Sequence, residues 1–142
     1  EALFRQISNT LAAIETEPLT LQIRGLGQFP PHRAPRILWL GLAENDRLVQ
    51  LRNRIETALL RSGLAPEGRG FSPHLTFARF KKMPPRQLLI DFIAANSRFE
   101  LPPFPVGAFH LYSSKITADG AIHQREASYP IPLAENAGTQ PV

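Results

Sequence analysis

The 142-residue chain has a length typical of one compact domain, and 43% hydrophobic residues are enough to build a core. It has no cysteine, which excludes disulfides, thiolate nucleophiles and cysteine-bound metals. A net charge of +4 favours phosphate-bearing ligands, although charge alone does not identify RNA. The apolar runs are too short to span a bilayer and no signal-like leader opens the sequence, so we expect a cytoplasmic protein without membrane contact.

The first half of the chain has the periodicity of a helix, two strands and a second helix. Apolar residues at helical spacing predict a helix over residues 1–16. Alternation over residues 19–24 predicts a strand that the glycines after it interrupt. Residues 37–42 are typical of a central strand, and a helix capped by Asn45 or Asp46 follows and ends near Gly63.

The second half predicts a strand that begins near His74, a helix after two prolines, and a closing hairpin. The hairpin consists of strands over residues 106–113 and 122–129. Because a hairpin pairs its strands antiparallel, an α+β fold with antiparallel or mixed sheets fits better than a doubly wound parallel sheet. We expect a single domain over residues 1–133 and a disordered tail over residues 134–142.

The strand around His74 carries the side chains with the clearest chemistry. Side chains alternate between the two faces of a strand, so His74 and Thr76 share one face while Leu75 and Phe77 are expected to point into a core. An imidazole can transfer a proton near neutral pH, and a hydroxyl can donate to a phosphate oxygen. The pair therefore fits one half of a two-group acid/base site for phosphoester chemistry.

The plainer interpretation of His-x-Thr is an ordinary strand with a hydrogen-bonded histidine, because two residues make a weak motif. The residues around the pair favour the functional interpretation. Pro73 holds the residue before it in an extended conformation, and Arg79 places a guanidinium near the end of the strand.

Residues 72–79, Ser-Pro-His-Leu-Thr-Phe-Ala-Arg, resemble the second His-x-Thr-x motif of the two-histidine (2H) phosphoesterases. The resemblance is to the LigT-like branch, the RNA 2′,3′-cyclic phosphodiesterases that are also called 2′-5′ RNA ligases. Residues 21–30, 36–42 and 111–114 are similar to further strands of that family. Four segments in the same order are far more specific than one His-x-Thr.

The resemblance implies a bilobal α+β fold whose two pseudo-symmetric halves line a cleft with two His-x-Thr motifs. One histidine of such enzymes acts as general base on water and the other protonates the leaving ribose oxygen, without metal or cofactor. On this sequence His74 would supply one acid/base imidazole, Thr76 a phosphate hydrogen bond and Arg79 a charge-assisted phosphate contact. The ligands implied are RNA ends or small cyclic nucleotides.

The position of Arg79 conflicts with simple strand alternation. An offset of five residues from His74 places it on the other face of a regular strand. A bulge, or the end of the strand, is needed to turn it toward the face of His74. Without that distortion Arg79 is a surface charge.

The first His-x-Thr-x motif of the family does not occur in this sequence. His32, His110 and His123 each lack a threonine two positions on, and His110 is the least unsuitable substitute because it lies in a predicted strand. The chain as given would therefore lack the N-terminal strand, helix and strand of the fold. It would be a fragment, or would have further residues that are disordered, or would be completed by another molecule.

Each explanation for the missing motif has consequences for the chain by itself. An exposed sheet edge would favour self-association or a partner. Hydrolysis would be slow or absent, because one of two proton-transfer groups is missing. Two other functions stay open: a non-catalytic module that binds RNA or nucleotide phosphate, and a plain structural domain. Trp39 fits a core position better than a base-stacking one.

Overall fold

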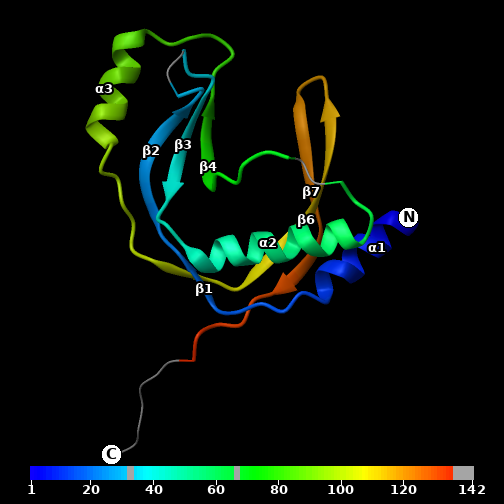
Figure 1. Cartoon of the computed structure of the whole chain (residues 1–142). Coiled ribbons are helices and arrows are strands. Elements are labelled where there is room, and N and C mark those ends of the chain that lie inside the picture. Colours follow the sequence, from blue (N-terminus) through cyan, green and yellow to red (C-terminus); the bar gives the residue numbers. More distant parts are fainter. Residues whose placement is uncertain (32–33, 66–67, 136–142) are drawn as a thin grey trace, which may run out of the picture. The chain divides into compact units, whose positions relative to one another are not determined.

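A three-stranded antiparallel sheet carries His74, within one of two compact units (Figure 1). The computed structural model describes residues 1–31, 34–65 and 68–135. The sheet unit comprises Thr20–Asn45 and Arg69–Phe104. The hairpin unit comprises Glu1–Leu19, Asp46–Gly68 and Pro105–Val142.

Strand β3 (Ile37–Leu42) is central in the sheet unit, between β2 (Ile23–Phe29) and β4 (His74–Arg79). Both pairings are antiparallel. The side chain of Leu38 is 3% exposed, because this face of β3 packs toward the interior of the unit. The predicted strand over residues 37–42 is confirmed with the same bounds.

Strand β2 is longer than the sequence predicts, because its glycines do not end it. Gly25 adopts a φ of +77° where the register with β3 shifts, between Ile23 and Leu26. A left-handed residue of this kind is typical of a bulge, in which glycine relieves the steric conflict. The strand continues through Gly27 to Phe29. The predicted strand over residues 19–24 is thus divided into β1 (Leu19–Leu21) and the start of β2.

Helix α3 (Arg86–Asn96) follows Pro84 and Pro85 as expected. It packs against β2, and its Leu89 is 7% exposed. Proline suits the start of a helix because the first turn has no intrahelical partner for its N–H groups. Helix α3 therefore covers one face of the sheet unit.

The hairpin unit contains helices α1 (Ala2–Ala12) and α2 (Asp46–Arg61) with strands β6 (Ala108–Thr117) and β7 (Gly120–Pro130). Helix α1 ends four residues before the predicted position. Its last turn closes when Ala13 N–H donates to the carbonyl of Asn9 and Ile14 N–H donates to that of Leu11. Gly63, at a φ of +86°, follows α2 as a glycine C-cap does.

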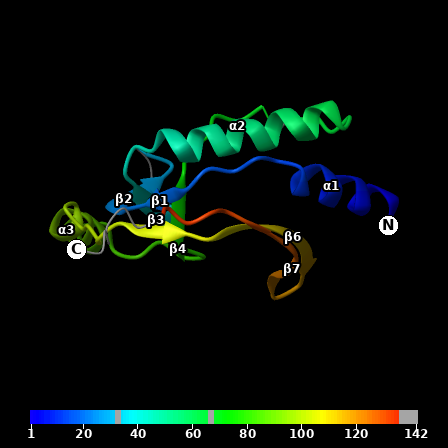
Figure 2. The ribbon, with the colours of Figure 1, turned by 90° about the horizontal axis from the view of Figure 1, so that it is seen from below.

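Helix α1 contacts both α2 and β7 within the hairpin unit (Figure 2). The hydroxyls of Thr10 and Ser62 are 2.9 Å apart, which connects α1 to the end of α2. The phenol of Tyr129 donates to Ser8 Oγ at 3.1 Å, which connects β7 to α1. Leu11 of α1 and Tyr129 of β7 are both buried, so both elements contribute to the core of the unit.

The remaining elements complete the α+β fold with antiparallel sheets that the sequence predicts. Strands β1 and β5 (Phe104–Val106) form a two-stranded sheet. The predicted hairpin strands are found with extended bounds as β6 and β7. The predicted tail lies mainly outside the described residues, which end at residue 135. Within the described part of the chain, no helix is both long and apolar enough to cross a membrane.

The expected burial of Leu75 and Phe77 is wrong. Their side chains are 46% and 45% exposed. The reason is that β4 is the edge strand of the described sheet and pairs with β3 on one side only. Phe77 meets a single described ring, that of Phe92 in α3, with centroids 6.5 Å apart. An edge strand with such side chains is a surface open to further packing.

We predict that Leu38→Ala lowers the free energy of unfolding by about 2–5 kcal/mol, because it removes a buried side chain and leaves a cavity. The matched control is Leu75→Ala on the exposed neighbouring strand, which should cost clearly less. Urea unfolding followed by circular dichroism measures both variants. Equal losses would contradict the assignment of Leu38 to the core.

Candidate active site

His74 is the first residue of β4, and the chain just before it fixes its ring. Its Nδ1 lies 2.6 Å from the carbonyl oxygen of Ser72. A carbonyl can only accept, so Nδ1 carries the hydrogen and donates it. In the neutral imidazole the lone pair then belongs to Nε2. The local backbone thus sets the tautomer, and Nε2 is the nitrogen that can exchange a proton with a ligand.

Two aromatic rings flank the imidazole. The ring of Phe29 meets His74 edge-on, with centroids 5.1 Å apart and planes at 82°. The ring centroid of Trp39 lies 6.3 Å from that of His74 and 5.4 Å from that of Phe29. The three rings come from β2, β3 and β4, so the sheet itself holds the imidazole in place.

Two glycines provide the space for this cluster. Gly27 lies opposite Trp39 in the register, and a Cβ there would come within 2.2 Å of the indole ring. Gly41 lies opposite His74, and a Cβ there would come within 2.5 Å of the carbonyl oxygen of Arg24. Real Cβ atoms do not approach other atoms so closely, so both positions require glycine.

A bulge in β4 brings Arg79 to the same face as His74 and Thr76. Leu38 pairs with Ala78 and Trp39 pairs with Thr76, so Phe77 is the extra residue. Residues directly opposite each other in antiparallel strands point to the same face. His74, Thr76 and Arg79 lie opposite Gly41, Trp39 and Ile37, which are alternate residues of β3. The bulge that Arg79 needs in order to share the face of His74 is therefore present.

The resulting face combines three complementary groups. An imidazole with a fixed tautomer, a hydroxyl donor and a guanidinium lie along one strand, and all three side chains are exposed. A phosphate oxygen can accept from the hydroxyl and the guanidinium while the imidazole exchanges a proton. In the described residues no group of three or more His, Asp or Glu side chains is arranged to hold a metal ion.

The sequence has three other histidines. His110 and His123 belong to the hairpin unit, where each forms a hydrogen bond with a serine hydroxyl across the hairpin. The distances are 2.9 Å from His110 Nδ1 to Ser128 Oγ and 2.7 Å from His123 Nδ1 to Ser114 Oγ. His32 lies outside the described residues.

Sequence reasoning missed the aromatic wall beside His74. Trp39 is half-buried, and its Nε1 is buried without a hydrogen-bond partner among the described residues. Its ring is thus neither a simple core side chain nor an open stacking surface. The sequence does contain a signal for this wall. Gly27 and Gly41 lie in neighbouring strands, and a residue without a side chain leaves room for a large ring beside it.

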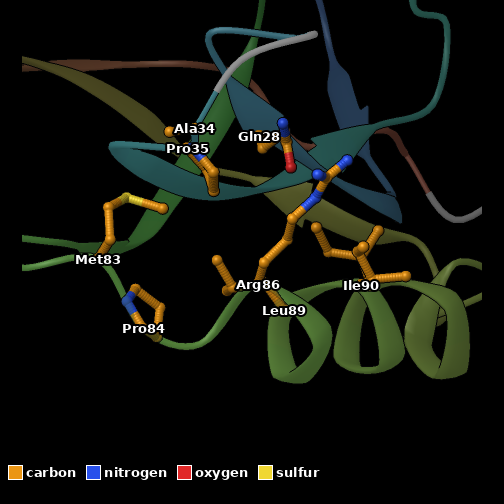
Figure 3. Close-up of a pocket in the computed structure, with 9 residues that line it drawn as sticks. Gln28, Ala34, Pro35, Met83, Pro84, Arg86, Leu89 and Ile90 are labelled. Atoms are coloured by element: carbon orange, nitrogen blue, oxygen red, sulfur yellow. The ribbon is translucent and has the colours of Figure 1, made fainter.

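A separate cavity of about 600 Å³ lies between α3 and the sheet (Figure 3). The strand register places it on the other face from His74. Gln28 marks this face, because it pairs with the buried Leu38. Figure 3 shows Arg86 extending from the start of α3 toward Gln28. The other lining residues are mostly apolar: Ala34, Pro35, Met83, Pro84, Leu89, Ile90 and Ile93. The cavity is therefore not part of the face that carries His74, Thr76 and Arg79.

The sequence is similar to known proteins over most of its length. Residues 1–116 match the family described as the 2′-5′ RNA ligase superfamily. A relative from Aeropyrum pernix, named RNA 2′,3′-cyclic phosphodiesterase, is 30% identical over 125 residues, covering 87% of this chain and 71% of that protein. A relative of the same name from Methanothermobacter thermautotrophicus is 32% identical over 107 residues, covering 75% of this chain and 58% of that protein.

Solved structures share the fold. A crystal structure of a protein from Thermus thermophilus superposes with a TM-score of 0.73 at 19% identity, covering 95% of this chain and 73% of that one. The crystal structure of Escherichia coli LigT complexed with 3′-AMP gives a TM-score of 0.65 at 23% identity, with coverages of 90% and 68%. These similarities establish the fold of the chain.

We predict that Gly27→Ala displaces the indole of Trp39, because the added methyl group occupies the space of the ring. Overpacking of this kind costs about 1–3 kcal/mol of stability. Trp39 is the single tryptophan of the sequence, so its fluorescence emission reports the displacement directly. The matched control is Gly70→Ala, where nothing lies within 4 Å of an added Cβ. An unchanged emission spectrum in Gly27→Ala would contradict the close packing.

Proposed function

Because the chain belongs to the 2′-5′ RNA ligase superfamily, we propose that it opens terminal 2′,3′-cyclic phosphates of RNA to 2′-phosphomonoesters. The observation that carries the proposal is the common face of His74, Thr76 and Arg79, to which the bulge at Phe77 brings the arginine. The names of the relatives from Aeropyrum pernix and Methanothermobacter thermautotrophicus support the same reaction.

In the proposed hydrolysis, water attacks phosphorus and the bond from phosphorus to the ribose 3′ oxygen breaks. One group removes a proton from the water and another delivers a proton to the 3′ oxygen. His74 performs one of these transfers through Nε2, while its Nδ1–H stays with the carbonyl of Ser72. The Thr76 hydroxyl donates to a non-bridging oxygen, and the Arg79 guanidinium offsets the negative charge on the phosphate.

The second proton transfer needs a second group. In the family that the sequence resembles, this group is the imidazole of another His-x-Thr motif, and His74 is the only histidine of this sequence with a threonine two positions on. The 142-residue chain alone is therefore expected to turn over slowly. When the 5′ hydroxyl of another RNA replaces water, the same bond changes give a 2′-5′ linkage, so ligation is the companion reaction.

A non-catalytic phosphate-binding module is the second candidate function. The observation in its favour is the single His-x-Thr motif, because binding needs only donors and positive charge. Hydrolysis of a cyclic substrate separates the candidates, because the module binds a 2′-phosphorylated nucleotide and does not hydrolyse the cyclic form.

We predict that His74→Asn lowers hydrolysis of a 2′,3′-cyclic phosphate by about a hundredfold or more, because it removes proton transfer at Nε2. The asparagine amide can still donate to the Ser72 carbonyl, so the backbone contact is retained. The matched control is Ser72→Ala, which keeps that carbonyl and should keep the rate. Wild-type turnover in His74→Asn would exclude a proton-transfer role for His74. Binding without any turnover by the wild-type protein would instead support the module.

We predict that Arg79→Gln weakens binding of a 2′-phosphorylated nucleotide by about ten- to a hundredfold, because it removes a charge-assisted hydrogen bond. The matched control is Arg69→Gln, the same charge change at an exposed loop position of the sheet unit. Calorimetric titration measures both variants. Equal weakening in the two would indicate a general charge effect instead of a contact on the face of His74.

A further inference from the structure

The β6–β7 hairpin carries a second set of polar side chains that the proposed reaction does not use. Three cross-strand pairs lie on one face: His110 with Ser128, Tyr112 with Arg125, and Ser114 with His123. We call these six side chains the hairpin strip. All six are exposed, and Tyr112 is 53% exposed. Figure 1 shows the turn end of the hairpin projecting beyond α1 and α2.

Contacts within the strip order its side chains. His110 and His123 each engage a serine hydroxyl through Nδ1, at 2.9 and 2.7 Å. The rings of His110 and Tyr112 meet edge-on, with centroids 6.1 Å apart and planes at 86°. An imidazole held through Nδ1 presents Nε2 outward, and an ordered ring loses little conformational freedom when a ligand binds.

A bulge keeps the nearby carboxylate off the strip. Leu111 pairs with Ala127 and Tyr112 pairs with Arg125, so Glu126 is the extra residue of β7. The Glu126 carboxylate accepts a hydrogen bond from Ser113 Oγ at 2.6 Å, and Ser113 lies on the opposite face of β6. The guanidinium of Arg125 therefore stands beside an aromatic ring and imidazoles, without a carboxylate among the six side chains.

The opposite face has a structural role near the base of the hairpin. Phe109 and Tyr129 stack there with centroids 4.9 Å apart, and Tyr129 donates to Ser8 of α1. They are paired directly next to His110 and Ser128, so they lie on the other face. The strip is thus the face that the described helices of its unit leave open.

We propose that the hairpin strip binds a segment of single-stranded RNA, with Tyr112 stacked on a base and Arg125 paired with a phosphate. Exposed aromatic rings on a sheet surface bind unpaired bases by stacking, and adjacent arginine binds the backbone. Hydroxyls and imidazole Nε2 atoms add hydrogen bonds to phosphate or to the 2′ hydroxyl. The choice of RNA rests on the proposed function.

The test measures binding apart from hydrolysis. A fluorescein-labelled RNA oligonucleotide with a 3′ hydroxyl end is titrated with the protein, and anisotropy gives Kd at several salt concentrations. Tyr112→Ala is expected to raise Kd about tenfold, and Tyr112→Phe to retain wild-type affinity because it keeps the stacking ring. Arg125→Gln is expected to raise Kd. It should also reduce the slope of log Kd against log salt concentration by the amount that corresponds to about one phosphate contact.

Two control variants lie on the opposite face of the same hairpin. Lys115→Gln removes a charge and Ile122→Ala removes an exposed apolar side chain, and these two residues pair with each other. Both should leave Kd unchanged. Equal weakening by the controls, or wild-type Kd in Tyr112→Ala and Arg125→Gln, would overturn the proposal.

Kinetics distinguish this proposal from the proposed function. For an RNA ending in a 2′,3′-cyclic phosphate, the strip variants should raise KM and leave kcat. For a 2′,3′-cyclic mononucleotide they should change neither, because a mononucleotide has no strand to contact the strip. If the wild-type protein hydrolyses neither substrate, the proposed function fails, and the anisotropy titration still decides whether the strip binds RNA.

Discussion

The antiparallel pairing of β3 with β4 is the constraint on which the candidate site depends, because it decides which side chains share a face. One extra residue, Phe77, lies between Thr76 and Ala78 in that pairing. On the N-terminal side of the bulge the pairing sets an imidazole and a hydroxyl on one face, and on the C-terminal side it adds the guanidinium of Arg79 to the same face. A regular strand would direct that guanidinium to the face of Leu38.

The second constraint is the close approach of backbone to rings around His74. Glycine at positions 27 and 41 lets Trp39 lie across β2 and lets β2 and β3 come together behind the imidazole. The ring of His74 is then held by an edge contact and by one backbone carbonyl. An imidazole held in this way is already ordered, so proton transfer does not require it to lose further conformational freedom.

Local patterns predicted the elements well, and pairing between elements explains what they missed. Residues 37–42 form a short apolar run between turn signals, so the bounds of β3 could be predicted. His74 and Thr76 share a face because the strand between them is regular. The bulge at Phe77, the exposure of Leu75 at the sheet edge and the wall formed by Phe29 and Trp39 depend on which strands become neighbours. A single segment of sequence carries no information on that choice.

Each compact unit is assembled from separate pieces of chain, and this sets an order for its formation during synthesis. All residues of the sheet unit have been made once Phe104 has left the ribosome. Helix α1 is made well before β7, because Tyr129 follows its partner Ser8 by 121 residues. Contacts so distant in sequence form slowly. The side of α1 that carries Ser8 must therefore wait without this partner until β7 has been made.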